Sequence, residues 1–155
     1  MSQFGGYPEV VDIGAKVGQS AGVAPGDLVL IDLTSDDGYT TVDISALNTG
    51  GEWFGDYGVV LGRGTEKIGE GEDVIVRIQG PVDIAAVNGT IAIDDYLTPN
   101  WAGPANNLVV SAALTVPPTT VAHLVLLDQV IGKAEAANAS GDGTIKVILF
   151  GRRGR

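Results

Sequence analysis

Two segments of this chain recur later in the same chain at one spacing. The five residues that begin at Val11 resemble the five that begin at Val82, and the seven that begin at Val74 resemble the seven that begin at Ile145. The members of both pairs are about 70 residues apart, and a repeated unit that cannot close its own core packs on its copy. The sequence therefore predicts an internal duplication, with pseudo-repeats at 11–80 and 82–151. A duplicated chain of this kind is typical of a scaffold rather than of a single asymmetric reaction pocket.

The composition of the chain indicates the all-β class. The 155 residues are 45% hydrophobic, mainly Val, Ile, Leu and Ala, and they include 23 glycines. Short β-branched runs separated by Gly, Asp and Asn are typical of strands joined by turns. We therefore expect one β-barrel-like or β-sandwich-like domain over residues 10–151, with long loops and at most one short helix.

Charge and cysteine content exclude several classes of protein. The formal net charge of −10 disfavours binding to a nucleic-acid backbone. The chain has no cysteine, so it has neither disulfides nor thiolate metal sites. It has no signal-peptide pattern at its N-terminus and no run of roughly 20 apolar residues that would span a membrane. We expect a protein that is made soluble in the cytoplasm and uses no cofactor.

The two ends of the chain differ in character from the domain between them. Residues 1–9 contain two glycines and a proline, which disfavour helix, and two aromatic anchors, Phe4 and Tyr7. They form either an extended arm that docks on a neighbour or a frayed terminus. Residues 152–155 carry three arginines, which form either a solvated tail or an electrostatic anchor. These arginines are Arg152, Arg153 and Arg155.

Alternation and turn residues predict the strands between these ends. The Asp37-Gly38 pair marks a tight hairpin turn, and Asn88-Gly89 marks another. Two long loops, 47–57 and 98–107, separate the strands and carry the aromatic residues Trp53, Phe54 and Trp101. Residues 119–131 fit either a short helix or, near Val130, a strand. The predicted strands are 10–17, 28–31, 39–44, 59–61, 74–78, 108–116, 130–132 and 144–150.

One short motif resembles a catalytic one. Residues 18–22 match G-x-S-x-G, the nucleophile elbow of serine hydrolases, and His123 lies downstream. The elbow requires a helix directly after the serine, whereas here Pro25-Gly26 and then a strand follow. We therefore interpret Ser20 as a turn residue and His123 as a packed residue of an apolar segment.

The remaining polar clusters also fit turns better than sites. One histidine and no cysteine exclude the common zinc and iron sites, and the Asp pairs at 36–37 and 94–95 lack EF-hand spacing. The Gly-rich stretch 62–72 lacks the Gly-Lys-Ser/Thr of a phosphate-binding loop, so we expect a hairpin loop there with its acidic residues in solvent.

Two motifs faintly resemble those of the trimeric deoxyuridine triphosphatases, which are all-β enzymes of similar length. The resembling segments are 24–28 and 91–96. The Arg-Ser motif of that family is missing between them, and the chain ends without the family's Gly-rich, Phe-containing C-terminal motif. This resemblance makes a nucleotide hydrolase the alternative in the enzyme class.

A broader resemblance runs from residue 24 to residue 151. Residues 24–29 resemble the Gly-Asp turn into a strand that is found in the head decoration, or capsid cement, proteins of tailed bacteriophages. Residues 58–62 and 130–134 resemble a strand of that family, 71–80 resemble its Gly-bounded strand, and 142–149 resemble its closing strand. The long loops at 45–57 and 98–120 depart from the family pattern.

This resemblance implies a non-enzymatic structural protein of the virion. Such proteins bind the major capsid protein on the outer surface of the head, commonly as homotrimers. The alternative structural readings are a head fibre base, a tail component or a glycan-binding domain. The residues that we select for the partner interface are Phe4, Tyr7, Trp53, Phe54, Trp101, Arg152, Arg153 and Arg155, although the loop aromatics could equally cap the ends of the barrel.

Overall fold

The computed structural model describes residues 9–33, 38–42, 56–100, 108–110, 130–139 and 143–151. This part of the chain contains nine strands and no helix, so the predicted all-β class is confirmed. The strands are β1 (Val11–Val17), β2 (Leu28–Leu33), β3 (Tyr39–Val42), β4 (Asp56–Leu61), β5 (Asp73–Val87), β6 (Tyr96–Pro99), β7 (Leu108–Val110), β8 (Gly132–Ala134) and β9 (Gly143–Phe150).

The first five strands close into a barrel, here called ring 1. Its strand order is β1-β3-β2-β4-β5, and β5 pairs back with β1. The β1–β3 pair is parallel and the other four pairs are antiparallel. All five pairings use residues between Val11 and Gln79. Closure leaves no strand at the edge of an open sheet.

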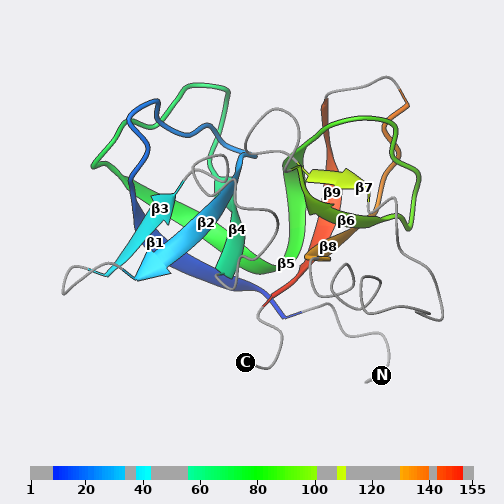
Figure 1. Ribbon diagram of the computed structural model, residues 1–155, viewed down its shortest axis with the longest axis horizontal. Coiled ribbons are helices and arrows are strands. Elements are labelled where there is room, and N and C mark those ends of the chain that lie inside the picture. Colours follow the sequence, from blue (N-terminus) through cyan, green and yellow to red (C-terminus); the bar gives the residue numbers. More distant parts are fainter. Residues whose placement is uncertain are drawn as a thin grey trace.

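A second barrel, ring 2, begins on the same strand that ends ring 1. Its order is β5-β7-β6-β8-β9, and β9 pairs back with β5. The 15-residue strand β5 pairs with β1 and β4 through its first half and with β9 and β7 through its second half. Figure 1 shows the two rings side by side with β5 running between them.

Ring 2 repeats the topology of ring 1 pair by pair. Its β5–β7 pair is parallel like β1–β3, and its four antiparallel pairs match those of ring 1. The turns before β2 and β6 also agree: Asp27 Oδ2 accepts the Ala24 N–H at 2.8 Å, and Asp95 Oδ2 accepts the Ala92 N–H at 2.7 Å. This agreement is the structural pattern that a duplicated unit produces, and a common origin of the two halves stays a prediction.

Each ring has its own apolar interior. Residues on the inward faces of the ring 1 strands, such as Val29, Val60 and Val76, are at most 1% exposed and form one cluster. The interior of ring 2 forms a second cluster, which includes Leu97, Val147 and Leu149. Alternation along β-branched strands explains both clusters, because every second side chain faces the barrel axis.

The outer face of ring 1 packs against ring 2. Leu28, Leu30 and Val59 alternate with the inward residues of β2 and β4, yet they are 0% exposed and belong to the ring 2 cluster. At the same contact, the Ala86 N–H donates to the Gly26 carbonyl at 2.8 Å. The two rings therefore share an apolar interface as well as a strand.

Glycine is required at position 26 by both conformation and space. Its φ is +91°, and a Cβ there would lie 3.2 Å from Ile84 Cγ2 on β5. A side chain would disfavour the left-handed backbone and would press on the strand that the turn contacts. This explains why the turn before β2 needs glycine, whereas Asp94 occupies the matching place in ring 2 with a φ of 72°.

Several predicted strand boundaries were wrong. The strand predicted at 74–78 is part of the longer β5, which continues without a break to Val87. Thr98 and Pro99 lie in β6 rather than in the predicted 98–107 loop, because proline is tolerated at the end of a strand. The strand predicted at 130–132 begins at Gly132, where close pairing with β9 starts and a Cβ would lie 2.7 Å from the Ile148 carbonyl oxygen. The strand β4 begins at Asp56 and includes Tyr57, which were assigned to the 47–57 loop. Residues 111–129, with the ambiguous segment 119–129, lie outside the described residues.

Candidate interaction surface

The interface residues selected from the sequence all lie outside the described part of the chain. They are Phe4, Tyr7, Trp53, Phe54, Trp101, Arg152, Arg153 and Arg155. Their roles therefore stay predictions. The structure does describe the residues from which the arm and the tail leave the barrel, namely Glu9, Val10 and Gly151.

The arm and the tail leave the fold at the same point of β5. Gln79 pairs with Val11 at the start of β1 and also with Phe150 at the end of β9. A Cβ on the neighbouring Gly80 would lie 3.0 Å from the Glu9 carbonyl oxygen, which places the last residue of the arm on β5. Figure 1 shows the start of β1 and the end of β9 close together beside β5. The N-terminal arm and the C-terminal tail are therefore both attached to the fold near Gln79, which their positions in the sequence do not indicate.

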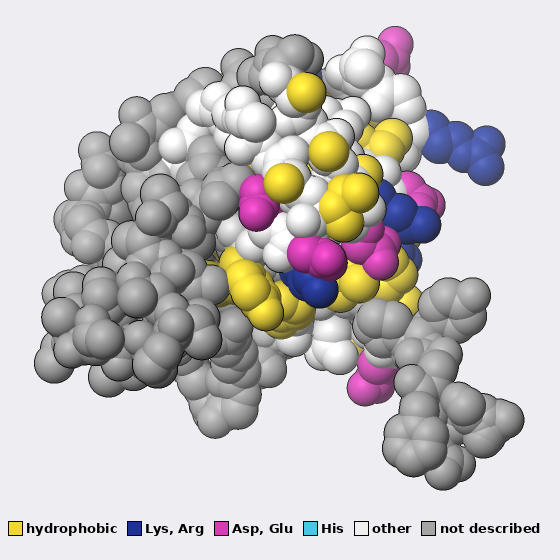
Figure 2. Space-filling model, turned by 90° about the vertical axis from the view of Figure 1, so that its right-hand side faces the viewer, with side chains coloured by type: hydrophobic (Ala, Val, Ile, Leu, Met, Phe, Trp, Pro, Cys, Tyr) yellow, Lys and Arg dark blue, Asp and Glu magenta, His cyan; other side chains and the backbone are white. Residues whose placement is uncertain are grey.

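Apolar side chains lie beside this point on the outer face of ring 2. Tyr96, 43% exposed, makes an edge-to-face contact with Phe150, with ring centroids 6.2 Å apart. Ile148 and Pro81 pair with each other across β9 and β5, and both are half-buried. We call Tyr96, Phe150, Ile148 and Pro81 the aromatic strip. Figure 2 shows hydrophobic side chains gathered on this side of the molecule, with charged side chains between them.

One ion pair lies within the aromatic strip, and a second lies at its edge. Lys133, which lies between Tyr96 and Ile148 in the strand pairing, is 2.9 Å from Asp94 Oδ1. The hydrogen bond and the charge of Asp94 raise the pKa of Lys133. Lys146 lies 3.8 Å from Asp83 on the adjacent β5. The aromatic strip therefore combines apolar side chains with charged side chains that are paired within the fold.

A bidentate ion pair lies on β5 at the boundary between ring 1 and ring 2. Arg77 Nε and Nη2 donate to the two carboxylate oxygens of Asp12 at 2.8 and 3.0 Å, and Nη1 donates to the Pro81 carbonyl at 2.6 Å. The hydrogen bond to Asp12 raises the pKa of Arg77 against the opposing effect of its burial. The guanidinium thus ties β1 and both halves of β5 together close to the aromatic strip.

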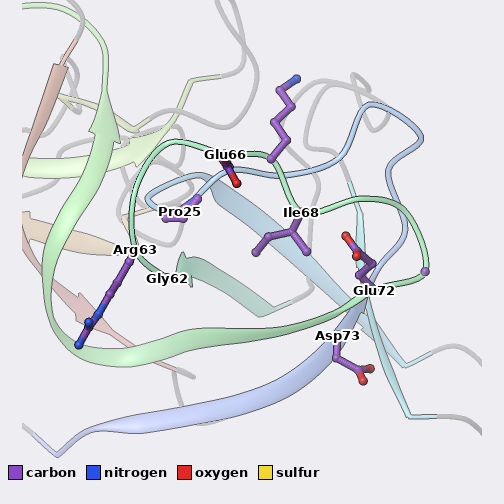
Figure 3. A pocket seen from close by; sticks show the side chains of 9 residues that line it. Pro25, Gly62, Arg63, Glu66, Ile68, Glu72 and Asp73 are labelled. Atoms are coloured by element: carbon purple, nitrogen blue, oxygen red, sulfur yellow. The ribbon is translucent and has the colours of Figure 1, made fainter.

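A pocket of about 610 Å³ lies at the far end of ring 1, between the 62–72 loop and the turn before β2. Three of its charged groups have partners in the fold: Glu72 accepts the Gly69 N–H, Asp73 pairs with Lys16 at 2.9 Å, and Lys67 donates to the Ala21 carbonyl. In Figure 3, Ile68 points into the pocket, whereas Asp73 points away from it. These three side chains hold the loop and the adjacent strand rather than converging on one point in the pocket.

The hydrolase motif lies in a different local structure from a nucleophile elbow. Ser20 is exposed on a turn after β1, and the chain passes through a second turn directly into β2. Its neighbour Gln19 is buried, and Gln19 Oε1 accepts the Thr41 hydroxyl at 2.6 Å. Within the described residues, no group of three or more His, Cys, Asp or Glu side chains is arranged to hold a metal ion. No helix in the same part of the chain is long and apolar enough to cross a membrane.

No family model matches the chain, and no curated protein matches it. Among solved structures, the chain is similar to the N base of the head fibre gp8.5 of bacteriophage phi29, with 16% sequence identity and a TM-score of 0.49. The match covers 95% of this chain and 100% of that chain. The resemblance to the decoration proteins therefore rests on the sequence motifs.

Proposed function

We propose that this protein is a structural component of a tailed-bacteriophage head, a decoration protein that cements the shell from its outer surface. Its partner is the major capsid protein, and it acts as a homotrimer. It catalyses no reaction, and it binds neither nucleic acid nor membrane.

The observation that carries this proposal is the order of the family-like motifs along the barrel strands. The 24–29 motif is the turn that leads into β2, the 58–62 motif is the main part of β4, and the 71–80 motif is the first half of β5. Residues 143–149 of the closing motif lie in β9. The motifs therefore fall on paired strands of the rings, which supports reading them as one structural pattern rather than as separate chance matches.

The position of the chain ends supports a clamping role. An arm with two aromatic residues and a tail with three arginines leave one point of the fold, so both can reach adjacent shell subunits at a seam. Binding to the assembled shell and not to free subunits stabilises the shell by mass action. Many copies of a modest interface then resist the pressure of packaged DNA.

The test is quantitative proteomics of gradient-purified particles from a lysate that contains this protein. We expect a copy number comparable to that of the major capsid protein. Absence from the particles, with abundant protein in the soluble fraction, would refute the proposal. A pyrophosphate-release assay with nucleoside triphosphates and a glycan array would then test the alternative functions.

A further inference from the structure

We propose that the aromatic strip is the face that docks on the shell, and that it binds a region of the capsid surface with an apolar depression bordered by carboxylates. This inference rests on the proposed function and adds to it the contact face and the chemistry of the partner surface.

The first argument is what the strip exposes. Tyr96 is 43% exposed, and its ring lies against Phe150, while Ile148 and Pro81 continue the apolar surface across β9 and β5. Tyrosine and other rigid aromatic residues supply large contact area at low entropic cost, and they dominate the centres of interfaces. The Lys146–Asp83 ion pair supplies polar groups at the edge of the strip, and the Lys133–Asp94 pair lies within it.

The second argument is that the matching face of ring 1 is already a contact face. In ring 1, Leu28 pairs with Val59, which pairs with Arg77. In ring 2, the corresponding row runs from Tyr96 through Lys133 to Ile148. Leu28 and Val59 are 0% exposed because ring 2 covers them, whereas in the ring 2 row Tyr96 is 43% exposed and the other two residues are half-buried. This face of the barrel therefore already serves for protein contact once within the molecule.

The differences between the two rows indicate what kind of partner fits. A lysine replaces valine in the middle of the row, and Asp94 takes the place of Gly26 in the preceding turn. These charged groups keep the open face hydrated when it is unoccupied. They suit a face that a separate partner protein covers with polar groups of its own, rather than a face that is permanently buried inside this chain.

The third argument is the charge at the edge of the strip. Phe150 belongs to the strip, and the chain continues from Gly151 directly into Arg152 and Arg153, with Arg155 after them. At most about 3.5 Å of chain separates successive residues, so these arginines stay within about 20 Å of the strip. Carboxylates are the groups that guanidinium binds best, so the partner surface should present them beside its apolar depression.

The test compares two matched double variants on shells that lack this protein. Y96S/I148T removes the apolar strip. Y39S/I75T makes the same chemical changes at Tyr39 and Ile75, which are 36% and 56% exposed in ring 1. Binding of each full-length chain to the shells is measured by sedimentation over a concentration series. We expect Y96S/I148T to weaken binding at least about tenfold, and Y39S/I75T to stay within about twofold of the unmodified chain.

A footprint keeps the test decisive even if Y96S/I148T fails to fold. Hydroxyl-radical labelling of the unmodified chain, free and on shells, should protect Tyr96 on binding and leave Tyr39 unchanged. Equal binding by both double variants, or no protection of Tyr96 on bound shells, would overturn the inference and leave the proposed function intact. No binding of the unmodified chain to shells would instead refute the proposed function. Protection of Tyr96 in free protein that rises with its concentration would identify a second copy as the occupant and would also overturn the inference.

Discussion

Leu28 and Tyr96 occupy matching positions in the two rings, so truncating each one measures how much the contact between the rings contributes to stability. Leu28 is 0% exposed under ring 2, whereas Tyr96 is 43% exposed. Truncation of a fully buried leucine to alanine costs about 2–5 kcal/mol, because it removes apolar contact and leaves a cavity. Truncation of Tyr96 removes the ring contact with Phe150 and part of its burial, which is worth about 1 kcal/mol.

The two costs convert to well-separated melting temperatures. For a chain of 155 residues, 1 kcal/mol corresponds to about 2–4 °C. At about 3 °C for each kcal/mol, we expect L28A to lower the Tm by about 6–15 °C and Y96A to lower it by about 3 °C. Reversible thermal unfolding followed by circular dichroism measures both. Equal shifts for the two variants would refute the reasoning, because they would mean that ring 2 does not bury the outer face of ring 1.

Three further predictions concern single side chains. G26A should destabilise the protein by about 1–2 kcal/mol in chemical denaturation, because the φ of Gly26 is +91°. The control G14A, with open space around position 14, should be neutral or slightly stabilising. Equal costs of the two substitutions would contradict this account of the turn. D95A should cost about 1 kcal/mol by the same method, since it removes the acceptor of a turn N–H, and an unchanged midpoint would count against that hydrogen bond. The pKa of Lys133, followed by NMR, should lie above the ordinary lysine value and fall in D94N. Because folding raises this pKa, the contribution of Lys133 to stability is present below the unfolded pKa and is lost as pH rises through the folded one; identical titrations with and without Asp94 would disprove the pairing.

Alternation and turn residues are sufficient to predict most individual strands. The run at Val11 became β1, and Thr144–Phe150 lies within β9, because their side chains alternate between core and solvent. The continuous apolar run at Leu28 became β2, which is buried on both faces. The strand β6 was missed because it is four residues long and its second half, Thr98 and Pro99, looks like a loop. Short strands take their stability from their neighbours, and a local pattern does not contain those neighbours.

Ring closure and the aromatic strip depend on pairings between residues that are far apart in the chain. Gln79 brings together Val11 and Phe150, and nothing in the local sequence of these three residues indicates that they meet. The strip did leave one signal: Ile148 and Phe150 follow Lys146 on the outward face of β9, where polar residues are expected. Two apolar residues at outward positions of a strand indicate a surface that a partner protein can cover.

The shared strand β5 gives the two rings an order in which they can form during synthesis. Every pairing of ring 1 lies within residues 11–79. This ring can therefore close once the first half of β5 has emerged from the ribosome. Ring 2 must wait for β9, at the end of the chain. In that interval, Leu28, Leu30 and Val59 face water on a finished barrel. A nascent chain therefore exposes this apolar surface until β9 has been synthesised and has paired. Aggregation competes with folding mainly during this second half of translation.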